Sequence, residues 1–249
     1  MTGSDIWQPL HDELDRWRDA NLTVELWLRD DDAFRPSPRL DRLIALTAEF
    51  GIPVALAIVP KQAKLPLAKR LALETHIHPV VHGWSHVNHA PLWQKKQELG
   101  PHRPRHVVLN DLTRGFARLS EFHGERLVPM LVPPWNRIDP GLLGDLPALG
   151  FRAVSTFGNN LKSRPGLPVV NTHIDLIDWH AGNACYDHAW LVAALTKELA
   201  AARASGGRPV GILSHHMISE DDAFQFLRGL FTAAPPTRVS WLAPGELFS

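Results

Sequence analysis

The chain has 249 residues, of which 45% are hydrophobic, and its 26 basic side chains balance its 26 acidic ones. This balance, with no basic stripe that carries interleaved aromatic residues, argues against nucleic acid or an anionic membrane as a partner. The single cysteine excludes an internal disulfide framework. Because no apolar run approaches a membrane span and residues 1–5 lack the pattern of a secretory signal, we expect a cytoplasmic protein.

Hydrophobic spacing predicts strands and helices that alternate along the whole chain. The predicted helices are residues 6–17, 40–50, 65–73, 106–122, 140–149, 187–204 and 221–230. The predicted strands are residues 22–28, 53–59, 76–82, 127–132, 151–155, 169–176, 209–213 and 238–242. Such alternation favours parallel βα units, but the pattern alone does not distinguish a barrel from an open sheet.

Three consecutive carboxylates, Asp30, Asp31 and Asp32, follow the first predicted strand. Neighbouring carboxylates repel one another, and a bound cation removes that cost. The alternative is an acidic turn, because Pro36 and Pro38 follow closely and Asp favours turns. Functional residues of α/β barrels lie at the C-terminal ends of strands, where this cluster is expected.

Two histidines four residues apart, His82 and His86, come where the strand at 76–82 is expected to end. Neutral imidazole is a common ligand of zinc and similar divalent ions, and this spacing lets two rings converge on one ion. Paired histidines are also frequent as polar loop or core residues. The third histidine, His89, fits a plain loop role better than a ligand role.

These two clusters and three later motifs resemble the polysaccharide deacetylase family, also called the NodB-homology domain or carbohydrate esterase family 4. The first family motif is similar to Thr-Phe-Asp-Asp-Gly, and the second is a pair of histidines with the spacing found here. The five matching stretches stand in the family's order: Leu28-Arg29-Asp30-Asp31-Asp32, His82 with His86, Val132-Pro133-Pro134-Trp135-Asn136, Asp175-Leu176-Ile177-Asp178-Trp179 and Leu213-Ser214-His215.

The resemblance implies an α/β fold, a distorted, incomplete (β/α) barrel of about seven strands, with residues 1–249 forming a single catalytic domain. It implies that Asp31, His82 and His86 hold a divalent metal ion. Zinc is the first choice, and cobalt, nickel, manganese or iron are alternatives. The implied activity is metal-dependent hydrolysis of an N-acetyl or related acyl group on a small-molecule or oligosaccharide substrate. The sequence leaves the oligomeric state open.

By the same resemblance, Asp30 is the general base, His215 is the general acid, and Asp178 orients that acid. The backbone N–H of Trp135 is expected to bind the oxyanion, because the two prolines before it cannot donate. Three residues are expected at the substrate: Trp179, Asn136 and Arg137.

One departure from the family concerns the arginine that begins the third motif, because Val132 stands at that position here. Arg29 and Arg137 are both candidates to replace it. We favour Arg137, because Arg29 is expected to point away from Asp30 in an extended strand. Two other functions stay open: a metal-dependent amidohydrolase of a non-sugar amide, and a catalytically inactive carbohydrate-binding relative.

Overall fold

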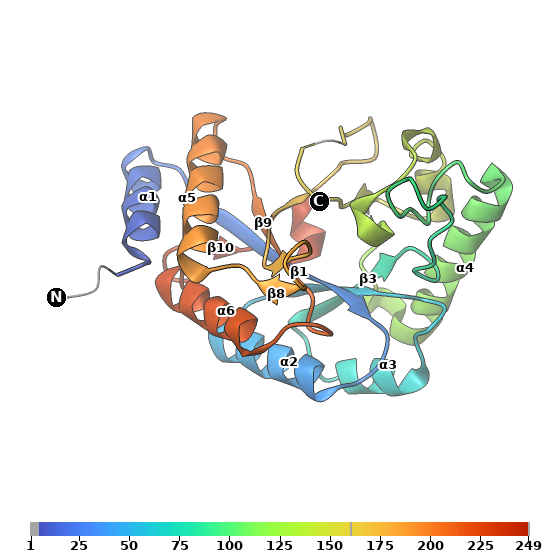
Figure 1. Ribbon diagram of the computed structural model, residues 1–249, viewed down its shortest axis with the longest axis horizontal. Helices are drawn as coiled ribbons and strands as arrows, with labels where there is room; N and C mark the ends of the chain where they lie inside the picture. The colour runs from blue at the N-terminus through green and yellow to red at the C-terminus, as the bar shows by residue number, and fades with distance from the viewer. Residues whose placement is uncertain (1–4, 160, 249) are drawn as a thin grey trace.

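The computed structural model describes residues 5–159 and 161–248. Seven parallel strands form an open, curled half-barrel in the order β5-β4-β3-β2-β1-β9-β6, and β10 adds a short strand beside β1 (Figure 1). The strands are β1 (Glu25–Ala33), β2 (Val54–Ile58), β3 (Ile77–His82), β4 (Met130–Val132), β5 (Ala153–Val154), β6 (Thr172–Asp175), β9 (Val210–Ser214) and β10 (Ser240–Trp241). A two-stranded antiparallel hairpin, β7 (Ile177–Asp178) with β8 (Ala184–Cys185), follows β6. The predicted incomplete barrel is confirmed.

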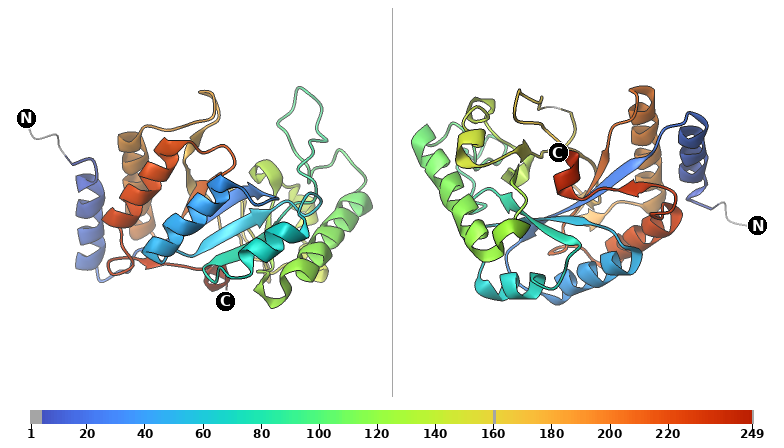
Figure 2. Two further views of the ribbon diagram at one scale, coloured as in Figure 1. Left: turned by 90° about the horizontal axis from the view of Figure 1, so that it is seen from below. Right: turned by 180° about the vertical axis from the view of Figure 1, so that it is seen from behind.

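Helices pack around the outside of the curled sheet (Figure 2). They are α1 (Gln8–Asp19), α2 (Pro38–Phe50), α3 (Leu65–Leu71), α4 (Arg105–His123), α5 (His188–Ala204) and α6 (Asp221–Ala233). The local sequence explains their ends: the Ser37 hydroxyl accepts a hydrogen bond from the Leu40 N–H and caps α2, and Gly51 ends it in the left-handed conformation. Strand β2 is apolar at every position because helices or strands cover both of its faces.

One predicted helix differs from the structure. Residues 140–149 form two short 3₁₀ helices, Pro140–Leu142 and Leu146–Leu149, separated by a turn that contains Gly144. Proline at the start of each segment and glycine between them favour short turns over a continuous helix.

Strand β1 lies in the middle of the sheet, between β2 and β9. Its pairing with β2 is irregular after Asp30. Between the pairs Asp30–Leu56 and Ala33–Ile58, two residues of β1 stand opposite one residue of β2. Asp32 lies inside this bulge with a φ of 71°, in the left-handed region. A bulge inserts one residue and turns the following side chain in a new direction, and this change decides which carboxylates enter the site.

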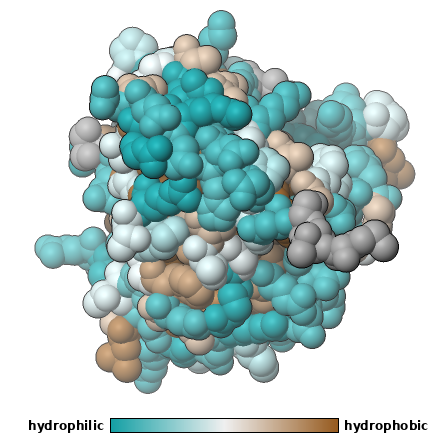
Figure 3. Space-filling model, turned by 90° about the vertical axis from the view of Figure 1, so that its left-hand side faces the viewer, coloured by the Kyte–Doolittle hydropathy of each residue, from teal (hydrophilic) through white to brown (hydrophobic). Residues whose placement is uncertain are grey.

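The surface on the side of α1 is mainly hydrophilic, and its hydrophobic residues form small separate patches (Figure 3). Among the described residues, no helix combines the length and the apolar character that crossing a membrane requires.

Candidate active site and metal centre

A cleft of about 950 Å³ opens at the C-terminal ends of the parallel strands. It collects side chains from the ends of β1, β3, β4, β6 and β9, as expected for the functional end of a barrel-like sheet. Its lining includes Asp31, Asp32, His82, His86, Lys95, Lys96, Trp135, Asn136, Arg137, Phe157, His173, Asp175, Trp179, Tyr186, Trp190 and His215.

Asp32, His82 and His86 bring three metal-binding groups together in this cleft. One carboxylate oxygen of Asp32 lies 3.1 Å from the Nε2 atom of His82 and 3.1 Å from the Nε2 atom of His86. The three groups lie within 4.8 Å of one another. The predicted convergence of the two histidines is therefore present, but the carboxylate beside them is Asp32 instead of Asp31.

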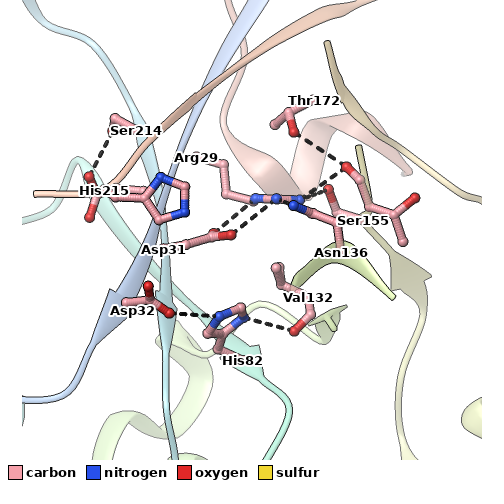
Figure 4. A network of polar contacts seen from close by, with 12 residues as sticks. Arg29, Asp31, Asp32, His82, Val132, Asn136, Ser155, Thr172, Ser214 and His215 are labelled. Carbon is pink, nitrogen blue, oxygen red and sulfur yellow. Dashed lines mark hydrogen bonds and ion pairs between the residues drawn. The ribbon is translucent and has the colours of Figure 1, made fainter. Parts of the chain in front are cut away.

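The hydrogen bonding of His82 suits a metal ligand. Its Nδ1 atom lies 2.9 Å from the carbonyl oxygen of Val132, which can only accept, so Nδ1 carries a proton (Figure 4). In the neutral ring the Nε2 lone pair then faces Asp32, and an outer hydrogen bond of this kind is typical of metal-bound histidine. A carboxylate and two imidazole nitrogens with open space beside them fit a divalent ion such as zinc.

Asp32 and the two imidazoles shift each other's pKa. Burial alone raises the pKa of Asp32, but hydrogen bonds and charge from His82 and His86 hold it well below its usual range. Burial alone lowers the pKa of His82, but the neighbouring carboxylates of Asp32 and Asp31 raise it above the ordinary value. The Asp32 carboxylate therefore stays ionised beside the two imidazoles.

Asp31 faces Arg29, two residues before it on the same side of β1 (Figure 4). Nη2 of Arg29 donates to Oδ2 of Asp31 at 3.1 Å, and Nε lies 2.9 Å from Oδ1. The Nε–H does not point at Oδ1, so this oxygen is buried with no hydrogen-bond donor from the described residues. Asp31 thus lines the cleft and is held there by the ion pair with Arg29.

Asp30 is not in the cleft, which does not fit its predicted role as general base. It is fully buried, and its carboxylate accepts hydrogen bonds from the Ser214 hydroxyl at 2.7 Å and the His216 N–H at 2.9 Å. The Nδ1 atom of His216 also lies against it at a short distance. Because side chains alternate along a strand, Asp30 points away from Arg29 and Asp31 and ties β1 to the end of β9.

His215 lies at the cleft, as predicted, but its carboxylate neighbour is not the predicted one. Nδ1 of His215 is buried without a hydrogen-bond partner among the described residues and lies 3.9 Å from Oδ1 of Asp175. Burial raises the pKa of the Asp175 carboxyl. Asp178 instead accepts hydrogen bonds from the N–H groups of His180 and Ala181 in the turn of the β7–β8 hairpin. The predicted orienting role of Asp178 does not fit this position.

The other predicted residues do line the cleft. The Trp135 ring packs on His86 with centroids 4.3 Å apart, and the Trp179 ring meets His215 edge-on at 4.8 Å. The side-chain oxygen of Asn136 accepts a hydrogen bond from Arg29 at 2.5 Å. Arg137 does not contact Asp30; its guanidinium donates to the backbone oxygen of Lys96 at 2.9 Å. Arg137 had been expected to pair with Asp30, but the arginine that pairs with a carboxylate of the cleft is Arg29, beside Asp31.

Four non-glycine residues of the site have φ near +60°: Asp32, His86, Trp135 and Asn136. This conformation is uncommon outside glycine and costs about 1–3 kcal/mol for each residue, so the surrounding structure must hold it. Its concentration at one cleft is typical of functional sites.

Reasoning from the sequence missed three residues: Asp32, Asp175 and Arg29 as the partner of Asp31. One signal could have identified the first. The family motif places a small residue after its Asp pair, and Ala33 follows Asp32. Matching the last two carboxylates of the triplet to that pair puts Asp31 and Asp32 in the positions that the structure brings into the cleft.

Comparison with known proteins finds similar structures but no significantly similar sequence. No family model matches the chain, and no curated protein matches its sequence significantly. A Mycobacterium smegmatis protein assigned to the polysaccharide deacetylases superposes with a TM-score of 0.68 at 18% identity, over 90% of this chain and 88% of the other.

Two further structures are similar. A peptidoglycan N-acetylglucosamine deacetylase superposes with a TM-score of 0.59 at 14% identity, over 90% of this chain and 87% of the other. A family 4 acetyl xylan esterase from Clostridium thermocellum, in complex with a cobalt ion, gives a TM-score of 0.50 at 14% identity over 90% of each chain. The chain therefore has the fold of the polysaccharide deacetylases and family 4 carbohydrate esterases, which confirms the predicted resemblance at the level of the fold.

Proposed function

We propose that residues 1–249 form a catalytic domain that hydrolyses an N-acetyl or related acyl group on a carbohydrate with the help of a divalent metal ion. The observation that carries this proposal is the pairing of two features in one cleft. The metal-binding triad of Asp32, His82 and His86 lies beside Asp31, whose side chain lines the same cleft and is held by Arg29. The structural neighbours support the reaction class, since they include deacetylases and an acetyl esterase.

In this proposal Asp32, His82 and His86 hold the ion. The ion, when bound, supplies Lewis-acid activation of the attacking water and of the acyl oxygen. Zinc suits one carboxylate and two imidazole ligands, and the cobalt-bound esterase supports a divalent transition metal without deciding which one.

Asp31 is the general base, in place of the predicted Asp30. The Asp31 side chain lines the cleft, and the ion pair with the guanidinium of Arg29 holds its carboxylate in one orientation. A general base must have an oxygen within reach of the proton that it removes. Asp31 meets this requirement, whereas both oxygens of Asp30 are held away from the cleft.

His215 is the general acid that protonates the departing amine. Its ring lines the cleft, and Oδ1 of Asp175 lies 3.9 Å from Nδ1, where it can orient the ring. Asp175 replaces Asp178 in this orienting role. The Trp135 backbone N–H stays our candidate for the oxyanion.

An experiment that follows acetate release tests the proposal. The purified protein is stripped of metal, reloaded with zinc, cobalt, nickel, manganese or iron, and incubated with N-acetylated oligosaccharides and with simple non-sugar amides. We expect metal-dependent release from the saccharides, slowed on the order of a hundredfold or more in an Asp31→Asn variant. Release from the non-sugar amides alone would favour the amidohydrolase, and no release under any metal would favour the inactive binding relative.

The lining of the cleft favours a sugar over a small amide. Trp179 and Trp190 expose 46% and 51% of their surface, and the Tyr186 and Trp190 rings stack with centroids 4.2 Å apart. Exposed aromatic faces that line a cleft are suited to the apolar faces of sugar rings.

A further inference from the structure

Unpaired positive side chains and a cluster of aromatic residues lie on different sides of the metal centre in this cleft. Lys95 and Lys96 belong to the segment after β3, and Arg137 follows β4. The aromatic residues Trp179, Tyr186 and Trp190 lie between β6 and the first turn of α5. In the sheet, β3 and β4 lie on one side of β1, and β6 lies on the other.

The three cations have no acidic partner within the described parts of the chain. Both lysines are exposed, and Arg137 is partly buried with a hydrogen bond only to a backbone carbonyl. Burial lowers the pKa of the Arg137 guanidinium. Removing a cation from water without an anion beside it costs free energy, which a bound anion returns.

The acidic side chains of the cleft already form ion pairs or hydrogen bonds with groups other than these three cations. Asp31 pairs with Arg29, and Asp32 contacts both histidines of the triad. Asp175 accepts hydrogen bonds from the Trp179 indole and the Ile177 N–H. The positive side of the cleft is therefore not neutralised by the protein, although the chain as a whole carries no net charge.

We propose that Lys95, Lys96 and Arg137 form an anion subsite that binds a carboxylate or phosphate group of the saccharide on the β3–β4 side of the reacting acyl group. This inference rests on the proposed deacylase function and narrows its substrate to an N-acylated saccharide with an anionic substituent. Sugar rings stack on the aromatic side, and the anion binds to the guanidinium and the two ammonium groups. Arginine is well suited to this task because its planar donors match the geometry of carboxylate and phosphate.

A binding experiment tests the subsite separately from the chemistry. The zinc-loaded Asp31→Asn variant is titrated calorimetrically with three N-acetylated oligosaccharides of equal length: one neutral, one with a uronic acid unit, and one with a phosphate monoester. We expect at least one anionic ligand to bind roughly tenfold more tightly than the neutral one, because hydrogen bonds to charged groups are the strong ones. The comparison of uronate with phosphate identifies the anion.

Adding Arg137→Met to that variant should remove the preference, and higher salt should weaken it, because salt screens exposed charges. Arg152→Met is the matched control, since Arg152 is exposed and does not line the cleft. Equal affinity for neutral and anionic ligands, or a preference that survives Arg137→Met, would overturn the subsite. Failure of the deacylase proposal would appear separately, as absence of acetate release from the unmodified protein.

Discussion

Arg29 and Asp31 form a buried ion pair on one face of the central strand, and the Asp31 side chain lines the cleft. The guanidinium also donates to the Ser155 hydroxyl at 2.7 Å and to Asn136, so its position is fixed from three directions. The family places an arginine for this purpose in the third motif. Here the cation comes from the same strand as the carboxylate.

We expect Arg29→Met to destabilise the protein by about 3–5 kcal/mol, because it leaves the Asp31 charge buried without a partner. Chemical denaturation measures this loss. The exposed pair of Arg228 and Glu49 is a matched control, and Arg228→Met should cost much less stability, because solvent screens an exposed pair. A loss below about 1 kcal/mol for Arg29→Met would mean that water or another group already neutralises Asp31.

Substitution of Asp30 should mainly reduce stability, whereas substitution of Asp31 should mainly reduce turnover. Asp30→Asn weakens the contacts to Ser214 and His216 and should lower the free energy of unfolding by about 1–3 kcal/mol, with much of the turnover kept. Asp31→Asn should reduce turnover on the order of a hundredfold or more, because an amide cannot take the proton. The check is kcat for each variant at a temperature where both are folded. The reverse order of losses would restore Asp30 as the base.

His215→Ala should slow release of a poor leaving amine more than release of an activated phenol, which departs without a proton. Asp175→Asn should show the same selective loss in a weaker form, because it acts through His215. Asp178→Asn is the control and should show no selectivity, since Asp178 caps a turn. Rates on an amide and a phenyl ester give the ratio, and equal losses on both substrates for His215→Ala would contradict its role as acid.

His173 should make the fold sensitive to acid. Burial, and then the charge of Arg208, lower the pKa of His173 to about 4. The Gly211 N–H donates to Nδ1, and Arg208 lies 2.9 Å from Nε2, so protonation adds a charge beside donors. Since the folded state resists this proton, stability is present above a pH of about 6.5 and falls as the pH drops toward about 4.

The expected loss across that window is on the order of 2–3 kcal/mol from this group. Urea unfolding at a series of pH values measures it for the unmodified protein and for His173→Gln. The variant should have a smaller decline between pH 6.5 and 4. Identical declines would show that other groups, such as His123 with its pKa also lowered to about 4, account for the acid sensitivity.

Much of the fold could be predicted from the sequence because alternation of apolar strands and amphipathic helices is a local signal. The positions of His82, His86 and His215 followed from motifs that each lie at one strand end. Which two of the three aspartates enter the cleft could not be predicted, because this depends on the bulge in β1 and on the left-handed conformation of Asp32. The sequence marks neither feature directly, and its one signal for the register is Ala33, the small residue that follows Asp32.

The sequence predicted Asp178 as the carboxylate beside His215, whereas the structure places Asp175 there. The cause is similar. Both residues belong to the Asp-x-x-Asp-Trp motif, and either one can face a histidine in an extended chain. In the structure β6 ends at Asp175 beside β9, and the chain then enters the β7–β8 hairpin, where Asp178 ends β7 and caps the turn. Only the pairing of distant strands decides which carboxylate meets His215.

The most direct test of the account is metal content, measured by mass spectrometry on purified Asp30→Asn, Asp31→Asn and Asp32→Ala variants with the unmodified protein and His82→Ala beside them. The account predicts about one divalent ion per chain in the unmodified, Asp30→Asn and Asp31→Asn proteins, and strong loss in Asp32→Ala and His82→Ala. Retention of metal by Asp32→Ala together with its loss from Asp31→Asn would contradict the account and return the ligand role to Asp31.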